Sequence, residues 1–485
     1  MTGPPLSKRE RLAIARQEMP ARDASERAHS FDEVNLGFAE QVAALEARRC
    51  LDCKRATCVD GCPVRVDIPG FVGEIERGDL AAAAQILFAG NALPAVTGRV
   101  CPQENQCEAA CIRGRKGAPV AIGHLERFVA DWARGHLHDE VIVPEPTGRH
   151  VAVIGAGPGG LTAAGELARR GHDVTIYEAL HLPGGVLTYG IPEFRLPNEI
   201  VQDEVRRLEA LGVRIECNVV IGRTYTLDEL RERFDAVFVS VGAGLPVFLN
   251  IPGEGLKGVY SANEYLTRVN LMRSYAFPEA DTPVLHGERV VVIGGGNVAI
   301  DAVRTALRLG AHEATIVYRR GRDELPARAE EVHHAEQEGV QFRFQVSPLA
   351  IEGDDDRWVA GVRCVDTELG EPDDSGRRRP VPVEGSEGVI PCDTVVVAVG
   401  TRANPLLTSS APELALTDRG YLVADEHGMT NLPGVFAGGD IVRGSATVIL
   451  AMGDGKRVAA TIDAYLHETP VAVTSGADSV AASNR

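Results

Sequence analysis

The chain has 485 residues, of which 44% are hydrophobic and 24% charged, as in a folded protein of about three domains. Its 50 basic and 68 acidic side chains give a net charge of −18, which argues against nucleic acid as a partner and favours a basic docking partner instead. No apolar run reaches the ~20 residues of a membrane span, and the N-terminus carries no apolar secretory signal, so a soluble, cytoplasmic protein is predicted.

Residues 1–145 form the first predicted domain, which is helical because the Ala-rich stretches 38–49 and 80–88 carry charges at helical spacing. Seven of the ten cysteines lie here, and in a chain without an export signal they indicate a metal centre rather than disulfides. They form two runs: Cys50, Cys53, Cys58 and Cys62, then Cys101, Cys107 and Cys111. The other three, Cys217, Cys364 and Cys392, are scattered and predicted to be buried core residues.

The spacing of these thiols favours iron–sulfur clusters. Zinc sites use two separated pairs of ligands, whereas Pro63 directly after the first run is typical of ferredoxin-like cluster sequences. Two four-ligand clusters need more ligands than the seven cysteines supply, so one ligand would have to be another residue type. Zinc and a purely structural role remain alternatives at this point.

The region 146–285 is predicted to begin a flavin-binding domain. The apolar run 151–154 leads into GAGPGG, where Gly155, Gly157 and Gly160 allow a tight turn and a close approach of the backbone to a pyrophosphate. The next predicted strand, 174–177, ends in Glu178, whose carboxylate suits a ribose diol, as in FAD. A Gly/Pro-rich loop that contains Gly185 and Arg195 follows and is predicted to pack against the flavin.

A second nucleotide-binding domain is predicted at 286–395. The apolar run 290–293 leads into GGGNVA, which supplies Gly294, Gly296, Asn297 and Ala299. The following strand, 315–318, ends in Arg319 and Arg320 where the first unit has its acid. A guanidinium pair binds a 2′-phosphate, so this site is predicted to prefer NADPH, with a solvated basic loop as the alternative.

The region 396–470 is predicted to complete the flavin domain. Its segment Gly438-Gly-Asp440 closes a strand at a helix start, and Asp440 is expected to bind a ribityl hydroxyl. Residues 471–485 have little pattern and are predicted to be a flexible tail. The expected fold class is α/β, with two Rossmann-like dinucleotide-binding domains, one inserted in the other, preceded by an α-helical iron–sulfur domain.

The motifs in this order resemble a known family. The two cysteine runs, GAGPGGL, GGVLTYGIPEFRLP, VVIGGGNVAID, VYRR and FAGGD are similar to those of glutamate synthase small subunits over roughly residues 25–468. They also resemble the N-terminal part of dihydropyrimidine dehydrogenase and the large subunit of NADH-dependent reduced ferredoxin:NADP oxidoreductases. The resemblance implies FAD, NADPH and two [4Fe–4S] clusters.

The resemblance also implies the cluster ligands. Its first cluster would be held by Cys50, Cys53, Cys58 and Cys111, and its second by Cys62, Cys101, Cys107 and Glu126. Read without the resemblance, Glu126 would be a charge on a helix surface.

Three functions are compatible with the sequence. The resemblance favours the small subunit of glutamate synthase, an electron-input module that needs the large subunit as its partner. The alternative is the large subunit of a ferredoxin:NADP oxidoreductase, whose partners would be a small NAD-binding flavoprotein and ferredoxin. The segment 19–34 resembles the corresponding segment of that branch of the family. A non-catalytic scaffold with vestigial cofactor sites is the third. No side chain is predicted to act as a nucleophile or general base, because the cofactors carry the chemistry.

Overall fold

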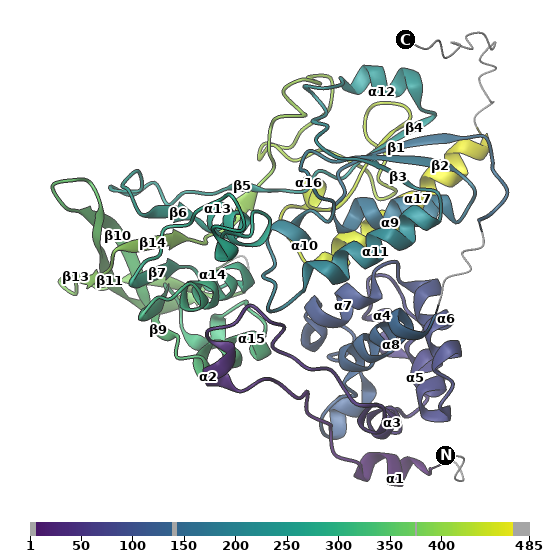
Figure 1. Cartoon of the computed structure of the whole chain (residues 1–485), viewed down its shortest axis with the longest axis horizontal. Helices are drawn as coiled ribbons and strands as arrows, with labels where there is room; N and C mark the ends of the chain where they lie inside the picture. Colours follow the sequence, from purple (N-terminus) through teal and green to yellow (C-terminus); the bar gives the residue numbers. More distant parts are fainter. Residues whose placement is uncertain (1–5, 138–142, 374–375, 469–485) are drawn as a thin grey trace.

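The computed structural model of the chain describes residues 6–137, 143–373 and 376–468. The region up to residue 137 is helical, as expected, and lies at the lower right of Figure 1, except for α2, which lies beside α15. Its helices are α1 (Lys8–Ala13), α2 (Ala24–Arg27), α3 (Glu40–Ala47), α4 (Thr57–Asp60), α5 (Ile68–Arg77), α6 (Leu80–Gly90), α7 (Pro94–Val100) and α8 (Ile122–His136), with the 3₁₀ turns η1 (Gln103–Asn105) and η2 (Ile112–Lys116).

Local capping explains where these helices begin and end. The Asp67 carboxylate accepts the N–H of Gly70 at 3.1 Å and starts α5, and the Asp79 carboxylate accepts the N–H of Ala82 at 2.9 Å and starts α6. Between them, Gly78 ends α5 with a φ of 81°, a conformation that glycine adopts without steric cost. The sequence Gly-Asp therefore stops one helix and starts the next.

A five-stranded parallel sheet with the order β16-β4-β1-β2-β3 follows. Its strands and helices are β1 (His150–Ile154), α9 (Pro158–Ala168), β2 (Asp173–Tyr177), α10 (Val186–Tyr189), α11 (Asn198–Ala210), β3 (Arg214–Glu216), α12 (Leu227–Arg233) and β4 (Ala236–Val239), then β16 (Val435–Ala437), α16 (Asp440–Arg443) and α17 (Val448–Glu468). Helix α9 packs on β1 and β2, and α17 runs along α9.

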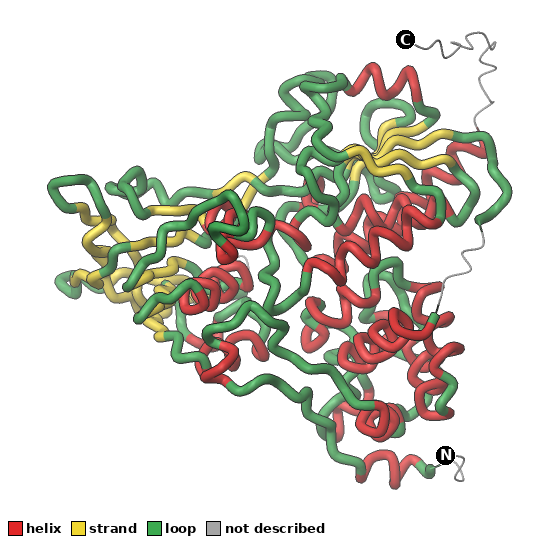
Figure 2. Tube along the Cα trace, viewed as in Figure 1, coloured by secondary structure: helices red, strands yellow, loops and turns green. Residues whose placement is uncertain are grey.

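A second parallel sheet has the order β6-β14-β7-β8-β9, and Figure 2 shows the two sheets as separate groups of strands. Its elements are β6 (Val259–Ser261), α13 (Ala262–Asn270), η3 (Ser274–Ala276), β7 (Arg289–Ile293), α14 (Asn297–Arg308), β8 (Glu313–Tyr318), η4 (Arg322–Glu324), α15 (Ala329–Gln337), β9 (Gln341–Phe344) and β14 (Thr394–Val397). An antiparallel sheet extends it: β10 (Val346–Gly353), β11 (Val359–Pro372), β12 (Arg378–Pro382) and β13 (Gly388–Pro391). The short strands β5 (Leu245–Pro246) and β15 (Thr401–Arg402) pair where the chain crosses between the two units.

The expected insertion of one dinucleotide unit in the other is confirmed by this order. The strand pairing refines the expected limits, since β6 precedes residue 286 yet pairs with β14, and β14 itself runs across the expected break at 395. The exact domain limits stay a prediction, and the predicted tail at 471–485 lies outside the described residues.

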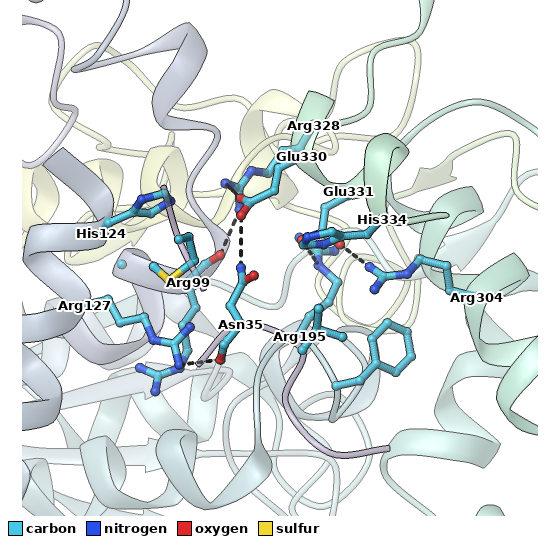
Figure 3. Close-up of a pocket in the computed structure, with 14 residues that line it drawn as sticks. Asn35, Arg99, His124, Arg127, Arg195, Arg304, Arg328, Glu330, Glu331 and His334 are labelled. Atoms are coloured by element: carbon cyan, nitrogen blue, oxygen red, sulfur yellow. Dashed lines mark hydrogen bonds and ion pairs between the residues drawn. The ribbon is translucent and has the colours of Figure 1, made fainter. Parts of the chain in front are cut away.

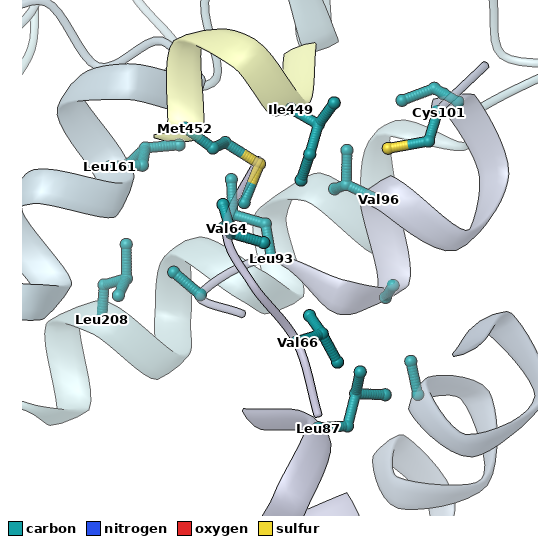
Figure 4. Close-up of a cluster of buried hydrophobic side chains, with 14 of the residues drawn as sticks. Val64, Val66, Leu87, Leu93, Val96, Cys101, Leu161, Leu208, Ile449 and Met452 are labelled. Atoms are coloured by element: carbon teal, nitrogen blue, oxygen red, sulfur yellow. The ribbon is translucent and has the colours of Figure 1, made fainter. Parts of the chain in front are cut away.

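The helical region and the first sheet share one hydrophobic core. Figure 4 shows Val64 and Leu93 of the helical region against Met452 of α17, with Leu161 of α9 on the other side. Buried apolar side chains of the two regions therefore form one contiguous core. Among the described residues, no single helix is long and apolar enough to cross a membrane. Taken together, α6 and α7, which meet at a bend of 85°, have the length and the apolar composition of such a helix.

Candidate cofactor sites

The first glycine loop has the shape of a pyrophosphate cradle. Gly155 has a φ of 103°, and a Cβ atom there would lie 2.5 Å from the Ser240 carbonyl oxygen. A Cβ on Gly160 would lie 1.9 Å from the Gly155 carbonyl oxygen, so the helix can only start this close to the strand with glycine at that position. At Gly157, the N-cap of α9, a Cβ would meet nothing within 4 Å, so this helix N-terminus opens onto free space.

Two carboxylates lie at the ends of two strands of the first sheet: Glu178 follows β2 and Asp440 follows β16. The N–H groups of Ala156 and Leu180 donate to Glu178 at 2.8 and 2.9 Å, which holds its carboxylate beside the glycine turn. Burial raises the pKa of Asp440 to about 6, and its Oδ1 atom is buried without a hydrogen-bond partner among the described residues. A buried unpartnered carboxylate oxygen costs free energy, and a hydroxyl of bound FAD would supply the missing donor. The residues present therefore fit FAD.

The Gly/Pro-rich loop places its two predicted flavin residues in different surroundings. Gly185 has a φ of 55°, and a Cβ there would lie 2.8 Å from the Cα atom of Gly157, so this loop packs directly on the glycine turn. Arg195 lies elsewhere: its Nη1 atom donates to both carboxylate oxygens of Asp301 on α14 at 2.8 Å, and its Nε atom lies 3.2 Å from Glu331 on α15. The structure thus uses Arg195 to join the flavin unit to the second unit.

This ion-paired junction is shown in Figure 3. Arg195 from the flavin unit meets Glu331, Arg304 and His334 of the second unit, while His124 and Arg127 from the helical region line the other side. The junction encloses a cavity of about 10 Å³, enough for one water molecule. Side chains from all three regions therefore meet at one buried polar contact.

The second glycine loop repeats the design of the first. Gly294 has a φ of 146°, and a Cβ there would lie 2.4 Å from the Ala398 carbonyl oxygen, whereas at Gly296, the N-cap of α14, it would meet nothing within 4 Å. Ala299 is fully buried on the first turn of α14. The Asn297 side chain accepts the N–H of Arg328 at 2.9 Å, which ties this helix start to α15. The loop thus offers a second open helix N-terminus that fits a pyrophosphate.

The structure separates the two arginines predicted to bind the 2′-phosphate. Arg319 is exposed at the end of β8 and available to a ligand. Arg320 is buried, forms an ion pair with Asp373 and donates from Nε to the Arg378 carbonyl oxygen at 2.8 Å. Arg378 in turn lines a cavity of about 340 Å³ together with residues 323–326, 376 and 377. Of the two predicted residues, Arg319 therefore has the exposed side chain and Arg320 the ion-paired one, and contact with a 2′-phosphate stays a prediction.

The first set of thiols converges near α1. Burial raises the pKa of Cys50 to about 11 and that of Cys58 to about 12, with a contribution from the neighbouring Cys111 sulfur in both cases. Burial and Cys111 also raise the pKa of Cys53, while the Lys8 ammonium acts in the opposite direction. Sulfur atoms that affect one another's protonation lie close together, so these four cysteines face a common site.

The second set converges around Glu126. Burial raises the pKa values of Cys62, Cys101 and Cys107, and the Glu126 carboxylate contributes to the shift in all three. Burial also raises the pKa of Glu126 itself to about 7. These neighbours group the cysteines as the family resemblance does, and the assignment of the cluster ligands stays a prediction.

Within the described residues, no group of three or more His, Cys, Asp or Glu side chains is placed to hold one metal ion.

Three side chains beside the second set were not foreseen from the sequence. The Asn91 amide donates to Glu126 Oε1 at 2.8 Å, and the Thr97 hydroxyl donates to the same oxygen. Lys456 of α17 donates to the carbonyl oxygens of Val64 and Gly90 at 3.0 and 2.7 Å, and so fastens the helix to the chain just after Cys62. None of these belongs to a recognisable motif, because their roles depend on contacts between segments far apart in the chain.

Tyr189 was also missed as a flavin-site residue. Burial raises the pKa of its hydroxyl to about 12, and the carboxylates of Asp440 and Glu178 contribute to the shift. Tyr189 therefore lies near both predicted flavin carboxylates. The only sequence signal was its position in the Gly/Pro-rich loop.

Two family models match the chain. The model described as pyridine nucleotide-disulphide oxidoreductase matches residues 149–455, and the model described as dihydropyrimidine dehydrogenase domain II, 4Fe-4S cluster, matches residues 27–137. Together they confirm the expected FAD- and NADP-binding chemistry and the iron–sulfur character of the helical region.

Relatives cover most of the chain. The glutamate synthase [NADPH] small chain of Halomonas elongata is 39% identical over 94% of this chain and 97% of its own length. The NADP(+)-dependent formate dehydrogenase subunit beta of Moorella thermoacetica is 41% identical over 85% of this chain, which spans only 60% of that subunit. Among solved structures, Mycobacterium tuberculosis FprA in complex with NADPH has a TM-score of 0.56 at 25% identity and covers 67% of this chain and 85% of its own.

Proposed function

Because the chain belongs to the family of pyridine nucleotide-disulphide oxidoreductases that includes the small chains of NADPH-dependent glutamate synthase, we propose that it is the electron-input subunit of such an enzyme. In this proposal the chain takes electrons from NADPH and passes them, through FAD and two [4Fe–4S] clusters, to a large partner subunit. When bound, FAD accepts a hydride and the clusters carry single electrons.

The observation that carries this proposal is the order of the sites in space. The second thiol set borders the flavin unit, since a Cβ on Gly453 of α17 would lie 3.1 Å from the Pro63 carbonyl oxygen, next to Cys62. Figure 4 shows Cys101 of the same set beside Ile449 of α17. Lys8 of α1 lies near Cys53 of the first set, and Figure 1 shows α1 at the end of the helical region that is far from the first sheet. Such an order supports a path from the flavin unit to the second set, then to the first set and outward.

The chain's own residues would bind, orient and shield the cofactors. The open N-termini of α9 and α14 would each bind a pyrophosphate, and Glu178 and Asp440 would orient FAD through its hydroxyls. Arg319 would select the 2′-phosphate of NADPH. Asn91 and Thr97 would hold Glu126 by one oxygen, which leaves the other for iron.

The first test is an anaerobic titration of the purified protein with NADPH. We expect about eight iron atoms per chain, four for each cluster, together with bleaching of the flavin absorbance and appearance of cluster signals in EPR spectra. Arg319→Ala should weaken NADPH binding by roughly 10- to 100-fold, the ~1.5–3 kcal/mol of a charge-assisted hydrogen bond, and leave NADH binding unchanged. A colourless protein, or one that NADPH does not bleach, would refute the proposal and revive the scaffold alternative.

The partner is tested by purification from the native host at low salt, followed by mass spectrometry. Recovery of a large subunit with glutaminase and FMN domains would establish the glutamate synthase assignment. The second candidate is the electron-input subunit of another NADP-linked enzyme, which the 41% identity to the formate dehydrogenase subunit favours. A small NAD-binding flavoprotein among the recovered proteins would instead indicate the ferredoxin:NADP oxidoreductase.

A further inference from the structure

The segment 453–456 of α17 lies between the flavin-unit glycine loop and the second thiol set. On one side, a Cβ on Gly453 would lie 3.1 Å from the carbonyl oxygen of Pro63, directly after the first cysteine run. On the other side, a Cβ on Gly455 would lie 2.2 Å from the carbonyl oxygen of Gly159, in the first turn of α9. The two glycines therefore let the backbone of α17 approach both sites closely.

Lys456 is the basic side chain of this segment. Its ammonium donates to the carbonyl oxygens of Val64 and Gly90, at 3.0 and 2.7 Å. Val64 is the second residue after the first cysteine run, and Gly90 precedes Asn91, whose amide donates to Glu126 at 2.8 Å. The two hydrogen bonds thus hold a positive charge between the two segments that border the second thiol set.

The charge of Lys456 has no ion-pair partner among the residues that the structure describes. Burial lowers the pKa of Lys456, while the Glu166 carboxylate and the Cys62 sulfur oppose that shift. Glu166 is itself paired with Arg169 and Arg170. A half-buried cation that only backbone oxygens contact is weakly screened by solvent, so its field reaches the thiol set.

Arg328 is a second cation beside this set, and its surroundings differ. Its guanidinium donates to the Arg99 carbonyl oxygen at 2.8 Å and to Gln103 at 3.0 Å, on either side of Cys101. Glu330 pairs with it at 2.8 Å and offsets its charge. Of these two cations, Lys456 therefore adds the larger uncompensated charge.

We propose that Lys456 is a positioning residue whose charge raises the reduction potential of the centre held by the second thiol set. Reduction adds one negative charge to such a centre, so a fixed cation nearby favours the reduced form. In each transfer the reduced flavin loses one electron and the centre gains it. The inference rests on the proposed function, because it takes this set as the first acceptor after the flavin.

The test is anaerobic voltammetry of the purified holoprotein, in which an electrode supplies the electrons and each couple is recorded separately. Lys456→Gln removes the charge and keeps a hydrogen-bond donor. It should make reduction of the second centre at least tenfold less favourable, a shift of ~59 mV to more negative potential for a one-electron couple. Lys456→Arg keeps the charge and should change that equilibrium less than threefold. Cys53→Ser, in the first thiol set, moves or removes the couple of the other centre and so identifies it.

Arg457→Gln is the matched control, because it removes the next cation on the same helix, an exposed side chain paired with Asp454. It should change the equilibrium less than twofold. Iron analysis and calorimetry report whether each variant keeps its clusters and its fold, and Lys456→Met provides a second neutral variant of similar length.

An unchanged second couple in the neutral variants would overturn the proposal. So would equal shifts of both cluster couples, or a shift in Lys456→Arg as large as that in Lys456→Gln, since charge would then not be the cause. Loss of iron from both neutral variants would leave Lys456 a structural role alone and would overturn it too. Flavin bleaching by NADPH, measured on the same proteins, reports separately on the proposed function, because the electrode reads the potentials whether or not NADPH delivers electrons.

Discussion

Glu338 is the residue whose replacement the structure predicts most sharply. Its carboxylate follows α15 directly, its side chain is fully buried, and it accepts five hydrogen bonds from three guanidinium groups. Arg304 and Arg308 come from α14, and Arg27 comes from the N-terminal segment that crosses the molecule in Figure 1. One carboxylate therefore joins a distant segment to the second nucleotide-binding unit.

The expected effect of Glu338→Gln follows from the pKa. Burial alone raises it, but hydrogen bonds from Arg304 and Arg308 outweigh burial and lower the pKa of Glu338 from 4.5 to about 2. Each unit of pKa corresponds to ~1.4 kcal/mol. The lowered pKa therefore means that the folded protein stabilises the charged Glu338 carboxylate by ~3 kcal/mol at neutral pH. The result agrees with the ~3–5 kcal/mol lost when one member of a buried ion pair is removed.

Differential scanning calorimetry provides the measurement. A loss of ~3 kcal/mol should lower the melting temperature of the second unit by roughly 6–12 °C, and hydrogen exchange should speed up in α2, which Arg27 ends. The matched control is Glu336→Gln in the last turn of α15, whose partner Arg322 is exposed. An exposed pair contributes at most ~1 kcal/mol. Equal shifts in the two variants would show that the buried cluster does not stabilise the protein.

Two further predictions concern the flavin loop and pH. Gly157→Ala should leave the apoprotein melting temperature unchanged yet abolish FAD retention, because its Cβ meets only the space reserved for the ligand. Gly160→Ala should also lower the melting temperature of the apoprotein, because its Cβ would lie 1.9 Å from a backbone oxygen. The ratio of flavin absorbance to protein absorbance measures FAD retention, and calorimetry measures the melting temperature. Burial lowers the pKa of His334 from 6.5 to about 4. Between these pH values the unfolded chain binds a proton that the folded chain does not, so stability should decline as pH falls through this window. His334→Gln should show a shallower decline in melting temperature, and parallel curves would contradict the assignment.

Short-range geometry explains why so much was predictable from the sequence. A strand followed by a tight turn and a helix needs glycine where a Cβ would strike the backbone, so Gly155, Gly160 and Gly294 marked both nucleotide loops. The helical character of the first region and the α/β class followed from periodicity over a few residues. The family resemblance, carried by whole motifs, supplied the two thiol sets, which stay a prediction.

The remaining features depend on contacts between distant segments. Arg195 lies in a flavin-binding motif, yet its guanidinium joins Asp301, more than one hundred residues away. Arg320 looked equivalent to Arg319 until the fold placed Asp373 beside it. Motifs determined which cofactors the chain can bind, because those sites are built from local backbone shape. The tertiary structure decided which charges are free and which are paired, because charge pairing depends on distance in space rather than along the chain.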